Sequence, residues 1–139
     1  MAFRRAGNAQ MVAVATAHHL RQVARETSTS TPAIRRDAFA KAARSFERCS
    51  DMIEDPRGQC AHYATAARCY VEVGLHQSAI RLFKLAEMYK EAALYSFQND
   101  LLDEAVYIVK KYRVHLDLYT IETITREARL NYLKARRIE

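Results

Sequence analysis

Residues 63–86 read YATAARCYVEVGLHQSAIRLFKLA, and small and aromatic side chains recur in this stretch at helical intervals. A first run consists of Tyr63, Ala66, Ala67 and Tyr70, and a second of Ala79, Leu82, Phe83 and Ala86. Gly74 lies between the two runs, and glycine readily takes the left-handed conformation that ends a helix. Alanines let two helix backbones approach closely. The stretch therefore predicts two helices joined by a turn at Gly74, with Ala67 at a close helix contact.

The same packing pattern occurs three times along the chain. Alanine pairs begin at Ala42, Ala66 and Ala92, which are 24 and 26 residues apart. Each pair is followed by an aromatic residue, and four residues after each aromatic stands a candidate turn residue. These are Phe46 with Ser50, Tyr70 with Gly74, and Tyr95 with Asn99. Because one helical hairpin cannot bury both of its faces, the recurrence predicts stacked antiparallel hairpins.

The spacing in residues 63–86 resembles a tetratricopeptide unit, in which bulky, small and aromatic residues recur at fixed positions. The matching residues are Tyr63, Ala67, Tyr70, Ala79 and Phe83. Three positions depart from the pattern: Tyr63 replaces the usual Trp, Ala66 the usual Leu, and Glu91 the closing Pro. The resemblance implies an all-α fold of antiparallel hairpins stacked as a tetratricopeptide-like α-solenoid. The alternative is an unrelated helical hairpin.

Composition bounds the domain organisation. A chain of 139 residues corresponds to about one domain, and its three glycines and two prolines leave few turns between helices. We expect one helical-repeat domain over residues 1–139 with about seven helices. It comprises the end of an earlier unit, closing at Gly7, plus a helix within 1–26, a loop at 27–32, repeat hairpins over 33–113 and a capping helix at 117–137.

The last four helices are expected at about 76–88, 90–98, 101–113 and 118–136. The helix over 101–113 is apolar on more than one face, so we expect neighbours on both sides of it. The last helix has a narrower apolar stripe, which predicts a cap with a polar outer face. That stripe consists of Leu118, Ile121, Ile124, Ala128 and Tyr132.

Several features bear on the compartment. No window of 18 consecutive apolar residues exists, so no membrane helix is expected. The amino terminus imitates a mitochondrial presequence, with four arginines and no acidic residue over 1–25, but its helical periodicity favours a structural helix. The three cysteines, Cys49, Cys60 and Cys69, contain no Cys-x-x-Cys pair and are typical of reduced, mostly buried thiols. We therefore expect an intracellular protein, cytoplasmic or nuclear.

Five segments together resemble the helical-repeat region of fungal homologues of tetratricopeptide and ankyrin repeat-containing proteins. They are Phe3–Gly7, Val12–Leu20, the helix around Phe46, Ala67–Phe83 and Ile121–Lys134. Members of that family also carry a superfamily 1, UvrD-like helicase motor. This chain departs from them, because no phosphate-binding Gly-x-x-x-x-Gly-Lys-Ser/Thr loop can be built around its glycines. The resemblance implies a helicase-associated repeat region without the ATP chemistry.

No catalytic or metal-ligating pattern stands out. His18 and His19 are adjacent, so they point to different helix faces. Cys60 and His62 have no second pair at zinc-finger spacing. Asp100, Asp103 and Glu104 lack the spacing of a calcium loop, and we interpret them as acidic residues at a helix N-terminus. We therefore expect a non-enzyme with no cofactor and no metal.

The charge is concentrated at the two ends of the chain. Residues 1–48 hold nine basic and three acidic side chains, and residues 109–139 hold eight and four. We expect a scaffold that mediates protein–protein interaction, with these basic ends as solvated faces. The alternative is an accessory nucleic-acid-binding element, with Arg126, Arg129 and Arg136 in contact with phosphates. We identify no aromatic residue between these arginines as a platform for stacking of bases.

Overall fold

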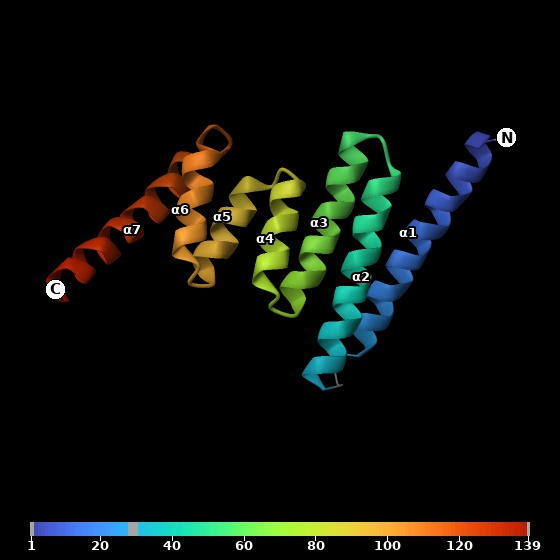
Figure 1. The fold of residues 1–139 in the computed structure, drawn as a ribbon, viewed down its shortest axis with the longest axis horizontal. Coiled ribbons are helices and arrows are strands. Elements are labelled where there is room, and N and C mark those ends of the chain that lie inside the picture. The colour runs from blue at the N-terminus through green and yellow to red at the C-terminus, as the bar shows by residue number, and fades with distance from the viewer. Residues whose placement is uncertain (1, 28–30, 139) are drawn as a thin grey trace. The chain divides into compact units, whose positions relative to one another are not determined.

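The computed structural model describes residues 2–27 and 31–138. Over those residues the chain forms seven α-helices and one short 3-10 helix and no strand, which confirms the all-α class and the expected number of helices (Figure 1). The elements are α1 (Ala2–Glu26), α2 (Pro32–Met52), α3 (Pro56–Glu72), α4 (His76–Leu85), α5 (Tyr89–Gln98), α6 (Leu102–Lys111), the 3-10 helix η1 (Arg113–His115) and α7 (Leu118–Ile138).

The contacts divide the chain into two compact units, Met1–Glu87 (unit 1) and Met88–Glu139 (unit 2). In unit 1, each of α1, α2 and α3 packs against the next helix in the sequence. In unit 2, α6 packs against both α5 and α7, and α5 also contacts α7. The single repeat domain over 1–139 stays a prediction.

The alanine pairs line the interior, as the repeat pattern predicts. Ala42, Ala43, Ala66 and Ala67 in unit 1, and Ala92 and Ala93 in unit 2, all have 0% exposed surface. An alanine without exposed surface in a helix is covered by a neighbouring element, so these positions mark the close contacts. The aromatic that follows two of these pairs is also buried, with 0% of Phe46 and 6% of Tyr70 exposed.

Polar cross-links join the helices of unit 1. Glu47 on α2 accepts hydrogen bonds from Arg81 on α4 at 2.9 Å and from the Tyr70 hydroxyl on α3 at 3.4 Å. The buried Ser50 hydroxyl of α2 donates to the Gln59 carbonyl of α3 at 3.0 Å. The Arg81–Glu47 ion pair, whose arginine side chain is 54% exposed, contributes at most about 1 kcal/mol, so it orients α4 against α2 more than it stabilises the fold.

The predicted turn at Gly74 is confirmed. Its φ is +72°, and two bonds of a Schellman motif close the end of α3 there. The amide of Leu75 donates to the Tyr70 carbonyl at 3.1 Å, and the amide of Gly74 donates to the Val71 carbonyl at 3.2 Å.

Two other predicted turn residues are wrong. Asn99 has a φ of −108°, and the left-handed residue is the next one, Asp100, at +62°. The Leu101 amide there donates to the Ser96 carbonyl at 2.9 Å, which closes the same Schellman motif. Ser50 ends no helix, since α2 continues to Met52 and Asp55 caps the following helix by accepting from the Arg57 amide.

Three boundary predictions also need correction. Gly7 does not close an earlier helix, because α1 runs without a break from Ala2 to Glu26. The loop predicted at 27–32 falls partly on residues 28–30, outside the described residues, and Pro32 already belongs to the first turn of α2. The helix predicted over 76–88 ends at Leu85, because the chain turns through Glu87 at a φ of +60°.

The apolar stripe predicted for the last helix is half right. Ile121 and Ile124 are buried and Ala128 is half-buried, but Leu118 is 66% exposed and Tyr132 is 60% exposed. The α6 helix has 10 residues and α7 has 21, which correspond to about 15 Å and about 31 Å of helix. A helix half as long as its neighbour cannot cover the neighbour's whole stripe, so residues 129–137 of α7 are all exposed.

Candidate functional site

The tetratricopeptide-like residues lie in the interior of unit 1 rather than on a binding surface. Ala67 and Ala79 have 0% exposed surface, and Tyr70, Phe83 and Ala86 have 6–7%. Tyr63 is half-buried and its hydroxyl donates to the Asp51 carboxylate at 3.4 Å. With Gly74 in the turn, this set determines the packing of unit 1.

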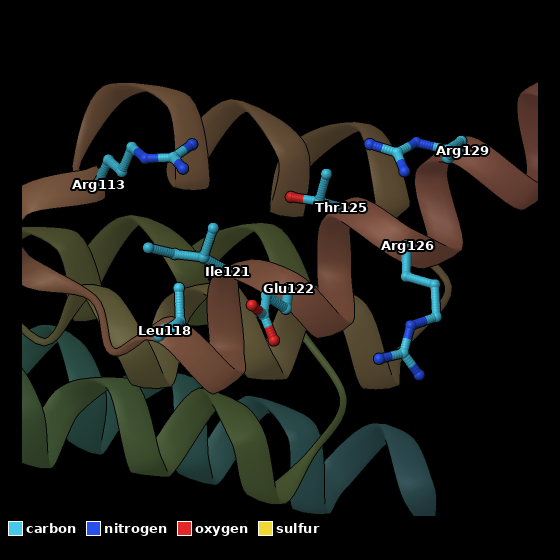
Figure 2. Close-up of a pocket in the computed structure, with 7 residues that line it drawn as sticks. All are labelled: Arg113, Leu118, Ile121, Glu122, Thr125, Arg126 and Arg129. Carbon is cyan, nitrogen blue, oxygen red and sulfur yellow. The ribbon is translucent and has the colours of Figure 1, made fainter.

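A concavity in unit 2 brings two of the three predicted phosphate-contacting arginines together. Arg126 and Arg129 of α7 line it, together with Arg113 of η1, which the sequence pattern did not single out (Figure 2). Its volume is about 360 Å³, and its other lining residues are Leu118, Ile121, Glu122 and Thr125.

The arginines in this concavity do not all point the same way. Figure 2 shows the Arg113 and Arg129 guanidinium groups directed toward each other, with Thr125 between them. Arg126 extends to the opposite side of α7, where the Glu122 carboxylate also points. The converging pair is therefore Arg113 with Arg129, and Glu122 places a negative charge beside the third arginine.

Arg136 lies outside these lining residues and contacts Tyr132 on its own helix. Its guanidinium lies 5.8 Å from the Tyr132 ring centroid, and its Nη1 is 3.5 Å from the tyrosine hydroxyl. The expectation of no aromatic among the α7 arginines is thus wrong, because Tyr132 is paired with Arg136 and 60% exposed. The spacing of four residues between the two was visible in the sequence and is the signal that could have found the pair.

Two further concavities follow the same seam between α6 and α7. One, of about 310 Å³, shares Arg113, Thr125 and Arg129 with the first and adds Val106, Val109, Lys110, Ile124 and Ala128. The other, of about 510 Å³, shares Val106 and Ala128 with the second and adds Asp100, Leu102, Asp103, Asn131 and Tyr132. Because neighbouring concavities share lining residues, they form one continuous groove, the α6–α7 groove.

The groove has opposite charges at its two ends. Arg113, Arg126 and Arg129 lie at the end formed by η1 and the first half of α7, with Lys110 nearby. Asp100 and Asp103 lie at the end formed by the start of α6. Between them the walls are apolar, with Val106, Val109 and Ile124.

The acidic residues before and within the first turn of α6 were predicted to lie at a helix N-terminus. Asp103 and Glu104 lie in that first turn, which confirms the prediction for these two. Asp100 precedes the helix and is its left-handed turn residue.

The start of α7 is fixed by a side-chain cap at one edge of the groove. The Asp117 carboxylate accepts from the Thr120 amide at 3.3 Å and from the Thr120 hydroxyl at 2.5 Å. The hydroxyl bond is the main cause that lowers the pKa of Asp117 below its usual value. A Lys90 ammonium from α5 lies 3.7 Å from the same carboxylate. These contacts hold the α7 N-terminus against α5.

The cysteines are poor candidates for reactive groups. Cys49 and Cys69 are buried and Cys60 is half-buried, which confirms the expectation of mostly buried thiols. Burial raises the pKa of the Cys69 thiol to about 11 and raises that of Cys49 as well. A thiol is a nucleophile or metal ligand only when it is deprotonated, so these thiols are inert at neutral pH.

Metal-binding clusters and membrane-spanning helices are both absent from the described residues. Within residues 2–27 and 31–138, His, Cys, Asp and Glu side chains form no group of three or more that could hold a metal ion. Over the same residues, no helix combines the length and the hydropathy needed to cross a membrane.

Comparison with known proteins adds no relative: no family model, no curated protein and no solved structure matches the chain.

Proposed function

We propose that the chain is a non-catalytic helical-repeat scaffold that binds a partner protein. The observation that carries the proposal is a pair of neighbouring exposed apolar side chains on the second half of α7. Leu130 and Leu133 are three residues apart, so they share one helix face, and they are 45% and 50% exposed. Contiguous exposed apolar side chains are typical of interaction sites.

The proposed architecture is a tetratricopeptide-like α-solenoid of antiparallel hairpins. Three features support it: fully buried alanine pairs in both units, Schellman turns at Gly74 and Asp100, and connections of three residues at 53–55, 73–75 and 99–101. Short connections favour antiparallel neighbours. On the resemblance described above, we propose that the chain is part of a larger helicase-type protein inside the cell, in the cytoplasm or nucleus.

A second candidate function is accessory nucleic-acid binding. The convergence of Arg113 and Arg129, and the pairing of Arg136 with the exposed Tyr132, favour it. Phosphate contacts and an exposed aromatic ring are the two elements of single-strand binding sites.

Salt dependence separates the two functions. The isolated protein is used to capture partners with and without nuclease, and oligonucleotide affinity is measured at two salt concentrations for the wild type and for a variant with Arg126, Arg129 and Arg136 changed to Gln. A scaffold keeps nuclease-resistant capture in both proteins. A tight, salt-sensitive oligonucleotide complex that the triple variant loses, with a log-log slope smaller by up to about three, would replace the scaffold function.

A further inference from the structure

The polarity of the α6–α7 groove restricts the kind of partner that fits it. A nucleic-acid backbone is negative along its whole length, so Asp100 and Asp103 at one end and Glu122 near the other would repel it. The same two aspartates would also repel a peptide that is acidic along its whole length. An occupant that places negative charge against Arg113 and Arg129 and positive charge against Asp103 satisfies both ends.

The walls and length of the groove favour a helix as that occupant. Val106 and Ala128 are half-buried and give the middle of the groove an open apolar surface between its charged ends, above the buried Val109 and Ile124. The seam follows α6, whose 10 residues span about 15 Å, the length of about three helical turns. An amphipathic helix of this length lays its apolar face into such a groove and presents charged side chains at its ends.

We propose that the α6–α7 groove binds an amphipathic helix of a partner protein, about three turns long, that carries acidic residues at one end and basic residues at the other. The proposal rests on the scaffold function and specifies the partner for it. The acidic end of the helix lies at Arg113 and Arg129, and the basic end lies at Asp103.

Three synthetic helical peptides of about 11 residues, or three turns, test the charge pattern. All share one apolar stripe; the first carries two Glu at one end and two Lys at the other, the second has Glu at both ends, and the third has Lys at both ends. We expect the wild type to bind the first peptide at least about fivefold more tightly than the other two, measured by fluorescence anisotropy. Amide chemical-shift changes should map to α6, η1 and α7.

Charge reversals in the groove should change the ranking rather than abolish binding. Asp103→Lys leaves only Asp100 acidic at that end, so the end becomes neutral and the wild-type preference for the Glu/Lys peptide over the all-Glu peptide should disappear. Arg113→Glu with Arg129→Glu makes the groove acidic, so the all-Lys peptide becomes the tightest. Arg137→Glu is the matched control, since Arg137 is an exposed basic residue of α7 outside the groove lining, and it should keep the wild-type order. A variant that merely unfolds weakens all three peptides alike, and far-UV circular dichroism identifies it.

Equal affinities of the wild type for the three peptides, no binding of any, or an unchanged order in Asp103→Lys overturns the proposal. A 20-nucleotide single strand is run in parallel. If it displaces the peptide and Asp103→Lys tightens its binding, the groove belongs to nucleic acid instead. The capture experiment tests the scaffold function separately. If Asp103→Lys and Arg129→Glu variants still capture a partner protein in the presence of nuclease, the scaffold function holds but does not use this groove. If the wild type captures no partner protein, both the scaffold function and the groove proposal are removed.

Discussion

The α2–α3 pair of unit 1 and the α6–α7 pair of unit 2 are both helix pairs, yet they leave very different surfaces. The α2 and α3 helices have 21 and 17 residues, and the alanine pairs along them, which begin at Ala42 and Ala66, are fully buried. The α6 and α7 helices have 10 and 21 residues, and the second half of α7 is exposed. Similar partner lengths convert an apolar stripe into core, and unequal lengths leave part of the longer helix exposed.

The largest expected effect contrasts a buried aromatic of unit 1 with an exposed one of unit 2. Phe46 has 0% exposed surface and contacts the His18 and His62 rings at centroid distances of 5.1 and 6.2 Å. Phe46→Ala should lower the free energy of unfolding by about 3–5 kcal/mol. Tyr132→Ala on α7 should change it by about 0.5 kcal/mol or less. Chemical denaturation measures both, and similar losses would erase the contrast between the two pairs.

Two alanine-to-leucine substitutions compare the helix interface of unit 1 with that of unit 2. Ala67 of α3 is fully buried, so Ala67→Leu should cost about 1–3 kcal/mol as the helices are forced apart. Ala128 of α7 lines the open groove, and Ala128→Leu has room to extend into it. We expect a change of about 0.5 kcal/mol or less for that control. Unchanged thermal unfolding of Ala67→Leu would remove the alanine seam as the cause of close packing.

A third pair of variants compares the two Schellman turns, at Gly74 and at Asp100. A Cβ on Gly74 would meet only the His76 ring, at 4.0 Å, so Gly74→Val acts through backbone strain at positive φ and should cost about 1–2 kcal/mol. Asp100 already carries that strain at a φ of +62°. Asp100→Gly should therefore leave stability unchanged or raise it by up to about 1 kcal/mol. Gly74→Val should lower the melting temperature and Asp100→Gly should leave it unchanged or raise it; a loss in both variants would contradict this expectation.

The smallest effect concerns pH and only unit 1. Burial lowers the pKa of His62 below its usual 6.5, with a smaller contribution from His18. The unfolded chain then binds a proton that the folded chain resists, so stability falls as the pH drops below about 6.5. His62→Gln should flatten this acid dependence. A wild type that is equally stable at pH 7 and pH 5.5 would contradict the assignment.

The core of unit 1 could be predicted from the sequence because the pattern of its residues is explained by close helix packing and by little else. Alanine pairs followed by an aromatic serve close packing, and all four paired alanines of unit 1 are fully buried. Gly74 was found for the same reason, since a helix that ends in a left-handed turn favours glycine. The register at Asn99 and Asp100 was not predictable, because both residues tolerate that conformation and the bond from the Leu101 amide decides between them.

The groove could not be predicted from local pattern. The stripe on α7 indicates which face turns inward, but the neighbouring elements decide which of its residues are covered. Leu118, the first residue of α7, and Tyr132, opposite the start of α6, were therefore wrongly expected inside. Arg113 stands 16 residues before Arg129, and only the turn through η1 brings the two together. The opposite charge at Asp103 likewise depends on how α6 and α7 pair.

The short connections of the fold have a kinetic consequence. In unit 1 each helix contacts its neighbour in the sequence, and three residues separate α2 from α3 and α3 from α4. The contacts that form the core are therefore local, which keeps the contact order low and the entropy of loop closure small. Helical proteins of this kind fold in microseconds to milliseconds. Unit 1 should thus acquire its alanine seams early and expose its apolar surface only briefly before they close.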